Sequence, residues 1–178
     1  MTPNSTFRRR ADKEAGEAIA QPSVVSQPSR RMLTGRADVE AMVDAFLRAG
    51  IPVSVCVLAV DGLASYTESF GLEERRHMLS RLRSLVLNNV RVEDVFGEIG
   101  NSRFALLLPG IVADGAVLVA ERLLLACRLA AWNCAPVSLS LGVTAARPGC
   151  LADERLQAAE SAAMLASQTG GARVLTAA

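Results

Sequence analysis

Aromatic residues, lysine and histidine are all scarce in this chain of 178 residues. Phe, Trp and Tyr make up only 4% of it although 51% of its residues are hydrophobic, so a core must be built from Leu, Val and Ala. Lys13 is the only lysine, and arginine or backbone amides must therefore bind any anion that the rest of the chain meets. His77 is the only histidine and has no recognisable catalytic partner, which predicts a surface residue.

Long apolar runs and metal-ligand spacings are also missing. No stretch reaches the roughly 18 uninterrupted apolar residues of a membrane span, and no secretory h-region follows Met1, which predicts a cytoplasmic protein without membrane insertion. Cys56, Cys127, Cys134 and Cys150 lack the spacing of metal ligands, so we expect no metal site and structural roles for these thiols. A net charge of +1 argues against a dedicated nucleic-acid partner.

The charges are unevenly distributed along the chain. Residues 1–31 carry six basic and three acidic side chains, a net charge of +3, which leaves −2 for the remainder. The same segment is polar and contains repeated Pro and Ser, as in QPSVVSQPSRR. This composition predicts a flexible basic tail over 1–31 and one domain over 32–178, which is long enough to enclose a core.

Hydrophobic periodicity predicts alternating helices and strands in that domain. Val39 to Leu47 repeat with helical spacing up to Gly50, and Pro52 to Val60 form a continuous run typical of a strand that is buried on both faces. The further predicted elements are helices at 65–70 and 72–89 separated by Gly71, a hairpin at 95–109, a helix at 114–131, a strand at 136–145, a helix at 153–167 and a strand at 172–175. This order predicts an α/β fold with a central mixed sheet of about five strands flanked by helices.

The hairpin raises the question of function. Val95 and Phe96 begin its first strand, Gly100 and Asn101 are suited to a tight turn, and Phe104 begins the return strand. Its tip carries no carboxylate between Gly100 and Phe104, although a hairpin tip is a common place for functional side chains.

Several landmarks in order resemble the GGDEF domain, the fold of diguanylate cyclases. The resemblance covers about residues 31–176, and each motif stands at the family's spacing. The matching segments are Leu33-Thr34-Gly35, the buried strand that ends in Asp61, the hairpin tip Gly100-Asn101-Ser102-Arg103-Phe104, the strand Ser140-Leu141-Gly142-Val143, and Ala159-Glu160-Ser161-Ala162 followed by Gly170.

The resemblance implies a reaction that joins two GTP molecules with the help of divalent metal, and this chain departs from the family at the residues needed for it. The family's two acidic metal ligands match Ala59 and Ser102, and its two guanine-binding residues match Thr67 and Arg76. Asn101 replaces the second glycine of the motif, Arg103 its glutamate, and Ser167 the phosphate-binding lysine. We therefore expect a catalytically inactive domain that needs no cofactor.

A second site of the family has its motif preserved. The family binds its product, the bacterial second messenger cyclic di-GMP, at an Arg-x-x-Asp segment that ends five residues before the hairpin motif, and Arg91 to Asp94 meet that spacing. A guanidinium can donate to the O6 and N7 edge of guanine, while a carboxylate accepts from its N1 and N2 edge. Arg122 matches a second arginine that the family adds from the following helix. The motif alone is unspecific, because Arg9 to Asp12 also fit it, and a surface Arg91–Asp94 ion pair is the structural alternative.

The resemblance thus implies a receptor for cyclic di-GMP that binds it through Arg91, Asp94 and Arg122 and passes the signal to a protein partner or through homodimer formation. The alternative is a ligand-independent protein-interaction module whose nucleotide sites are relics.

Overall fold

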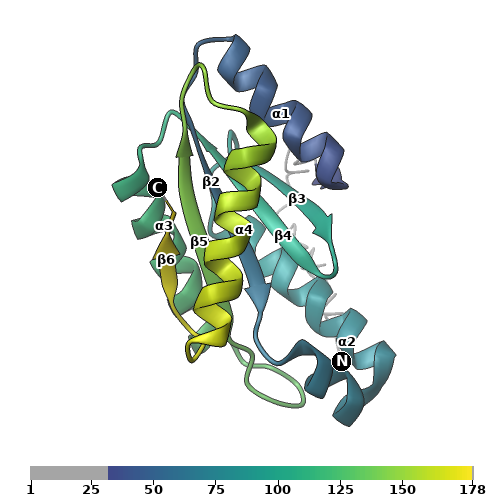
Figure 1. Ribbon diagram of the computed structural model, residues 1–178. Helices are drawn as coiled ribbons and strands as arrows, with labels where there is room; N and C mark the ends of the chain where they lie inside the picture. Colours follow the sequence, from purple (N-terminus) through teal and green to yellow (C-terminus); the bar gives the residue numbers. More distant parts are fainter. Residues whose placement is uncertain (1–31, 178) are drawn as a thin grey trace, which may run out of the picture.

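A six-stranded mixed sheet lies at the centre of the computed structural model, which describes residues 32–177 (Figure 1). The strand order is β1-β3-β4-β2-β5-β6. The strands are β1 (Met32–Thr34), β2 (Val53–Val60), β3 (Val95–Gly100), β4 (Arg103–Pro109), β5 (Leu139–Ala146) and β6 (Val174–Thr176). β2 is antiparallel to both β4 and β5, β3 and β4 form an antiparallel hairpin, and the edge strands β1 and β6 run parallel to β3 and β5.

The predicted α/β fold with a central mixed sheet is confirmed, with one more strand than the sequence pattern indicates. The additional strand is β1, whose three residues are too few to show a period. The predicted tail over residues 1–31 lies outside the described residues.

Two helices cover each face of the sheet (Figure 1). The helices are α1 (Arg36–Arg48), α2 (Leu63–Asn88), α3 (Ala113–Leu129) and α4 (Ala152–Gln168). On one face α1 and α4 bury residues such as Val43 and Leu156 against Val55, and on the other face α2 and α3 bury Leu82 and Leu123. The sheet therefore separates two aliphatic core layers. Within the described residues, no helix is both long and apolar enough to cross a bilayer.

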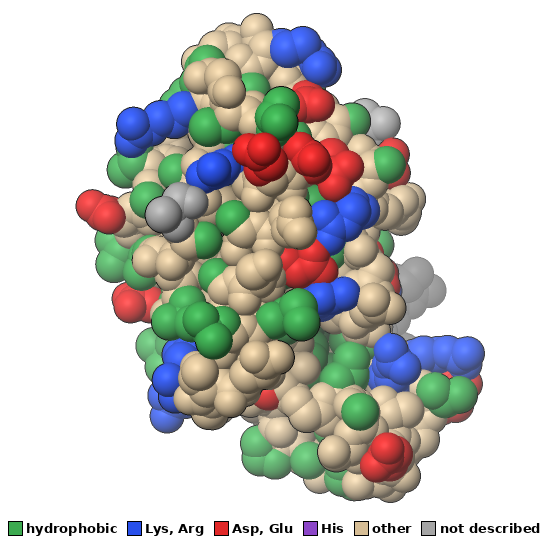
Figure 2. All heavy atoms as spheres, in the orientation of Figure 1, with side chains coloured by type: hydrophobic (Ala, Val, Ile, Leu, Met, Phe, Trp, Pro, Cys, Tyr) green, Lys and Arg blue, Asp and Glu red, His purple; other side chains and the backbone are tan. Residues whose placement is uncertain are grey.

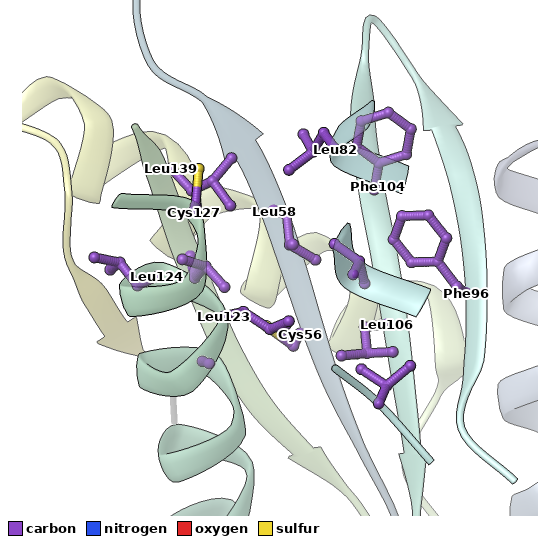
Figure 3. Close-up of a cluster of buried hydrophobic side chains, with 14 of the residues drawn as sticks. Cys56, Leu58, Leu82, Phe96, Phe104, Leu106, Leu123, Leu124, Cys127 and Leu139 are labelled. Atoms are coloured by element: carbon purple, nitrogen blue, oxygen red, sulfur yellow. The ribbon is translucent and has the colours of Figure 1, made fainter. Parts of the chain in front are cut away.

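The core beneath α2 and α3 is drawn in Figure 3, where Leu58 of β2 lies between side chains of α3 and side chains of the hairpin. Phe96 and Phe104, two of the five phenylalanines in the chain, stack on neighbouring strands with their ring centroids 5.4 Å apart. Burial raises the pKa of the Cys56 and Cys127 thiols to about 12, so both remain protonated and act as small apolar groups, as the sequence predicts.

The two helices predicted before and after Gly71 are confirmed, and they follow one another directly across a kink at that glycine, with the label α2 covering both. Gly71 has a φ of 83° and a ψ of 172° inside α2. A side chain would strain this conformation, so glycine permits the change of direction. The first part of α2 contributes Thr67 and Glu68 to a cavity that Asn101 of the hairpin tip also lines.

The hairpin turn lies one residue later than the sequence pattern predicts. Gly100 pairs with Arg103 across the end of the hairpin, and the two turn residues are Asn101 and Ser102, with φ values of 52° and 56°. Both are left-handed, as a two-residue type I′ turn requires. Asn adopts this conformation at low cost, whereas Ser102 depends on contacts outside the turn.

Candidate functional site

The tip of the β3–β4 hairpin is bound to α2 through a side chain that sequence comparison does not single out. Arg75 Nη2 donates to Ser102 Oγ at 2.7 Å, and Ser102 is buried although it sits in the turn. This contact supplies the support that Ser102 needs in its left-handed conformation. It also places a guanidinium beside Ser102, the residue that the resemblance matches to an acidic metal ligand.

The opposite side of the tip is bound to α4 and α1 by an ion-pair network. Arg103 Nη1 lies 2.7 Å from Glu160 Oε1, and Arg36 pairs with the other oxygen of the same carboxylate and with Glu40 at 3.4 Å. Figure 2 shows acidic and basic side chains adjoining one another on this face. Arg103 also donates to Met164 Sδ at 3.4 Å. The tip is thus held from three helices.

The residues at the tip do not fit a divalent metal ion. Ala59, near the end of β2, has a methyl group with no oxygen, and the Ser102 hydroxyl already accepts from Arg75. Within residues 32–177 no cluster of three or more His, Cys, Asp or Glu side chains could hold a metal ion. Hard cations need several oxygen ligands, preferably charged ones, and the nearby guanidinium repels them.

A cavity of about 460 Å³ remains beside the tip, and its lining includes only part of the predicted nucleotide residues. Thr67 and Asn101 line it together with Arg75 and Glu68. Thr67 Oγ1 donates to the Leu63 carbonyl of its own helix at 2.7 Å, which occupies the hydroxyl proton. Five of the matched residues do not line it: Ala59, Ser102 and Arg103, described above, and also Arg76 and Ser167.

The contacts of Arg76 and Ser167 lie elsewhere. Arg76 is exposed and pairs with Glu73 one helical turn earlier. Ser167, at the end of α4, donates to the carboxylate of Asp61. The matched residues therefore do not form one site: Arg76 lies on a helix surface, Ser167 contacts Asp61, and Thr67 and Asn101 line a small cavity.

Asp61 has a structural role, because four hydrogen-bond donors of the protein surround its carboxylate. Ser138 Oγ lies 2.8 Å from Oδ2, Ser140 Oγ 2.7 Å from Oδ1, and the Ala172 N–H 3.0 Å from Oδ2, while Ser167 supplies the fourth bond. Burial raises the pKa of Asp61, but these hydrogen bonds outweigh it and hold the pKa below its ordinary value. The carboxylate joins β2, β5, α4 and the turn before β6, and its oxygens are not free for a ligand.

The second candidate site lies between the end of α2, the start of β3 and α3. Asp94 is only 6% exposed, and its Oδ2 accepts the backbone N–H of Arg91 at 2.7 Å. Its Oδ1 is buried and has no hydrogen-bond partner. Burial, the largest influence, raises the pKa of Asp94 despite the bond from the Arg91 backbone and the positive charges of Arg91 and Arg122.

The three residues that the sequence predicts for this site therefore come together. The Arg91 side chain is exposed and is not joined to Asp94 by an ion pair within the described residues, so the predicted structural alternative, a surface pair, is not what the structure shows. Arg122 Nη2 donates to the Asn89 carbonyl at the end of α2, at 2.7 Å. The site consists of two guanidinium groups at the surface and one buried carboxylate oxygen without a donor.

Sequence reasoning missed the residues that fix the hairpin tip. Arg75, adjacent to the matched Arg76, makes the contact, and Glu160 joins the tip to α1 through Arg36. The sequence did contain a signal for Glu160. Arg103 is basic where the resemblance leads one to expect an acidic residue, and a guanidinium that is removed from water requires an acidic partner.

The family model described as "Diguanylate cyclase, GGDEF domain" matches residues 27–173. Among solved structures, the coiled coil and GGDEF domain of DgcB from Caulobacter crescentus in complex with c-di-GMP is similar at 15% identity and a TM-score of 0.72, over 83% of each chain. The active GGEEF domain of a diguanylate cyclase from Vibrio cholerae is similar at 18% and 0.74, over 83% of this chain and 99% of that one. The diguanylate cyclase SiaD from Pseudomonas aeruginosa, in complex with its activator SiaC, is similar at 24% and 0.74, over 81% of this chain and 58% of that one.

Identities this low establish a shared fold and nothing finer. The family model, in contrast, covers most of the chain, from just before β1 to the turn that precedes β6. On this match and this fold, the chain belongs to the GGDEF domain family.

Proposed function

We propose that this GGDEF domain binds cyclic di-GMP through Arg91, Asp94 and Arg122 and does not synthesise it. The observation that carries the proposal is the Oδ1 atom of Asp94, a buried carboxylate oxygen that lacks a donor and lies within the influence of two arginine charges. An unsatisfied buried acceptor costs free energy, and a ligand that supplies a donor recovers it.

Guanine offers donors and acceptors that suit this group. Its N1–H and N2–H₂ edge can donate to Asp94, and its O6 and N7 edge can accept from a guanidinium. Arg91 is exposed and free to turn towards a base, and Arg122 can exchange the Asn89 carbonyl for a phosphate oxygen. The dianionic dinucleotide also neutralises the two arginines. That DgcB was solved in complex with c-di-GMP supports this choice of ligand.

The absence of synthesis rests on the hairpin tip. Ala59 and Ser102 provide no carboxylate for a metal ion, and Arg75 binds the only hydroxyl in the position of a ligand. Loss of a single group that stabilises developing charge commonly costs orders of magnitude in rate. We expect no turnover of GTP with Mg²⁺ or Mn²⁺.

We infer that ligand binding changes how the domain contacts a partner protein or a second copy of the chain. The SiaD structure contains a cyclase bound to its activator SiaC, which supports the view that a domain of this fold can be controlled through a protein contact. The competing function is a ligand-independent interaction module. The hydrogen bond from the Arg91 backbone to Asp94 favours this alternative. That bond would explain an aspartate at this position by its structural role alone, without a ligand.

Isothermal titration of the full chain with cyclic di-GMP tests the proposal. We expect binding by the wild type, loss of at least about tenfold in affinity for Arg91→Ala, equivalent to about 1.4 kcal/mol, and a similar loss for Arg122→Ala. Arg48→Ala, an exposed arginine at the end of α1, is the matched control and should bind as the wild type does. Absence of heat at tens of micromolar wild-type protein would leave the interaction module as the better function. Turnover of GTP would show that the domain is an active enzyme.

A further inference from the structure

A row of exposed leucines runs along the face of α3 that points away from the sheet. Leu118, Leu125 and Leu129 are 67%, 54% and 76% exposed. The opposite face of the helix carries fully buried side chains such as Leu123 and Cys127, which lie in the core (Figure 3). The helix is therefore apolar on both sides, and its outer row has no partner among the described residues.

The row has the spacing of a helix–helix contact. Leu118, Arg122, Leu125 and Leu129 follow one another at intervals of four, three and four residues, which brings them onto one stripe of about 16 Å along the helix. Arg122 interrupts the apolar sequence, but its guanidinium bends away to the Asn89 carbonyl at 2.7 Å. Only its aliphatic stem remains beside the leucines.

Two exposed charges of opposite sign flank the row on one side. Glu121 and Arg128 stand seven residues apart, two helical turns, on the side of α3 that faces β6. Within residues 32–177 neither of them forms an ion pair in the single chain. With this spacing, the two side chains can form ion pairs with the corresponding residues of a second helix.

We propose that α3 pairs with α3 of a second copy of this chain in an antiparallel arrangement around a two-fold axis. In the register that places Leu118 against Leu129 of the second copy, the stem of Arg122 lies against the other Leu125. The same register places Glu121 opposite the other Arg128, and symmetry repeats the pair. Two ion pairs then flank four apolar contacts.

Charge selects this orientation over the alternative. A parallel pairing in register would stack Arg122 on Arg122 in the centre of the contact and would place Glu121 beside Ala126, which is uncharged. The antiparallel register separates the two arginines along the axis and satisfies both flanking charges. The occupant that fits the row is thus a copy of the row itself.

This pairing requires no nucleotide, and it adjoins the proposed ligand site at Arg122. The leucines, Glu121 and Arg128 take no part in that site, and Arg122 contributes to the pairing only through its stem. A failure of ligand binding would leave the dimer intact, and a monomeric protein would leave the ligand site intact.

Sedimentation velocity of the full chain without nucleotide tests the pairing. Over a range from about 1 to 200 µM, appropriate to a small interface, we expect the wild type to shift from monomer to dimer. Leu129→Glu should remain monomeric across the range, with its thermal transition unchanged because the side chain is exposed. A wild type that stays monomeric throughout, or a Leu129→Glu variant that still dimerises, would overturn the proposal.

Charge reversal tests the register itself. Glu121→Arg places arginines opposite each other, and Arg128→Glu does the same with glutamates, so each variant alone should associate at least about tenfold more weakly. An equimolar mixture of the two should recover the dimer, because each chain then offers the sign that the other lacks. Glu154→Arg, on an exposed part of α4, is the control and should dimerise as the wild type does. Failure of the mixture to recover, with both variants folded, would exclude this register.

Discussion

Two carboxylates with opposite surroundings, the half-buried Asp61 and the buried Asp94, define the chemistry of this molecule. Asp61 is surrounded by four donors and its pKa lies below the ordinary value, whereas Asp94 accepts one backbone N–H and its pKa is raised by burial. A saturated carboxylate holds structure together, and an unsaturated one retains capacity for a ligand. The contrast separates an anchor from a candidate site without reference to any relative.

Replacing Asp61 should destabilise the fold. Asp61→Asn removes the charge and turns an amide N–H₂ towards donors such as Ser140 and the Ala172 N–H, so we expect a loss of about 1–3 kcal/mol in the free energy of unfolding by urea. Glu93→Gln, an exposed carboxylate, should change it by less than about 0.5 kcal/mol.

The pH dependence of that loss has a definite sign. Because the pKa of Asp61 is depressed in the folded state, its contribution is present above the ordinary value of 3.8 and disappears as pH falls through the lower folded value. The difference between wild type and Asp61→Asn should therefore shrink below about pH 4. A difference that is constant with pH would mean that the charge contributes nothing.

Replacing Asp94 should give the reverse pattern. Because its pKa is raised in the folded state, the ionised carboxylate disfavours folding at neutral pH, and Asp94→Asn should leave stability unchanged or increase it slightly. The same variant should lose affinity for cyclic di-GMP, because an amide cannot accept from both guanine donors as a carboxylate does. A large loss of stability would mark Asp94 as a structural cap.

Ligand binding should also depend on pH through this residue. Guanine donors favour the ionised carboxylate, so the complex lowers a pKa that burial has raised, and affinity should fall as pH falls through the pKa of the free protein. Calorimetric titration at several pH values above the acid unfolding transition measures this slope, and Asp94→Asn should remove it.

The β3–β4 hairpin is held at its tip by side chains of two helices. Arg75 binds Ser102 from α2, and Glu160 binds Arg103 from α4. Both contacts fasten the tip to neighbouring helices. These contacts make the hairpin part of the rigid domain.

Breaking the Glu160 network should loosen the tip. Glu160→Gln leaves the guanidinium groups of Arg36 and Arg103 without their shared carboxylate, and we expect a loss of about 1–3 kcal/mol. In this variant, hydrogen exchange of the β3–β4 hairpin amides should accelerate more than exchange of the amides that pair β2 with β5. In a double-mutant cycle, Arg103→Ala should cost much less in the Glu160→Gln background than alone.

The contact between β5 and α4 is set by a single missing side chain. A Cβ at Gly142 would lie 1.9 Å from the Ala159 carbonyl oxygen, whereas one at Gly97 would meet mainly side chains, Val39 at 2.8 Å and Leu33 at 2.9 Å. Gly142→Ala should therefore cost at least about 3 kcal/mol and Gly97→Ala about 1–2 kcal/mol, measured by chemical unfolding. Equal costs would show that α4 can move away from the sheet.

At the scale of the whole molecule, the core layer beneath α2 and α3 should open only with global unfolding. Cys134 is exposed and Cys150 partly so, while Cys56 and Cys127 are buried with a pKa of about 12. A thiol reagent should label two cysteines in the native protein and the other two only at the rate of global unfolding. Labelling of Cys127 without Cys56 would show that α3 opens separately from β2.

Strong local patterns were sufficient to predict most of the fold. The β-branched run of β2, the glycine break at Gly71 and the helical periods of α1, α3 and α4 all appear within a few residues of their predicted bounds. The strand β1 was missed because three residues carry no period, and the turn at Asn101–Ser102 was placed one residue early because Gly100 is the more permissive turn residue.

The order of elements, the identity of the core and the grouping of Arg91 with Asp94 were determined by the sequence itself, since hydrophobic period and spacing along the chain depend on nearby residues. Only the tertiary structure decided that Asp94 is buried with one oxygen unpartnered, that Arg75 and Glu160 hold the hairpin tip, and that Asp61 joins four elements. Those properties arise from residues far apart in the chain, and no local pattern records which of them will share a hydrogen bond.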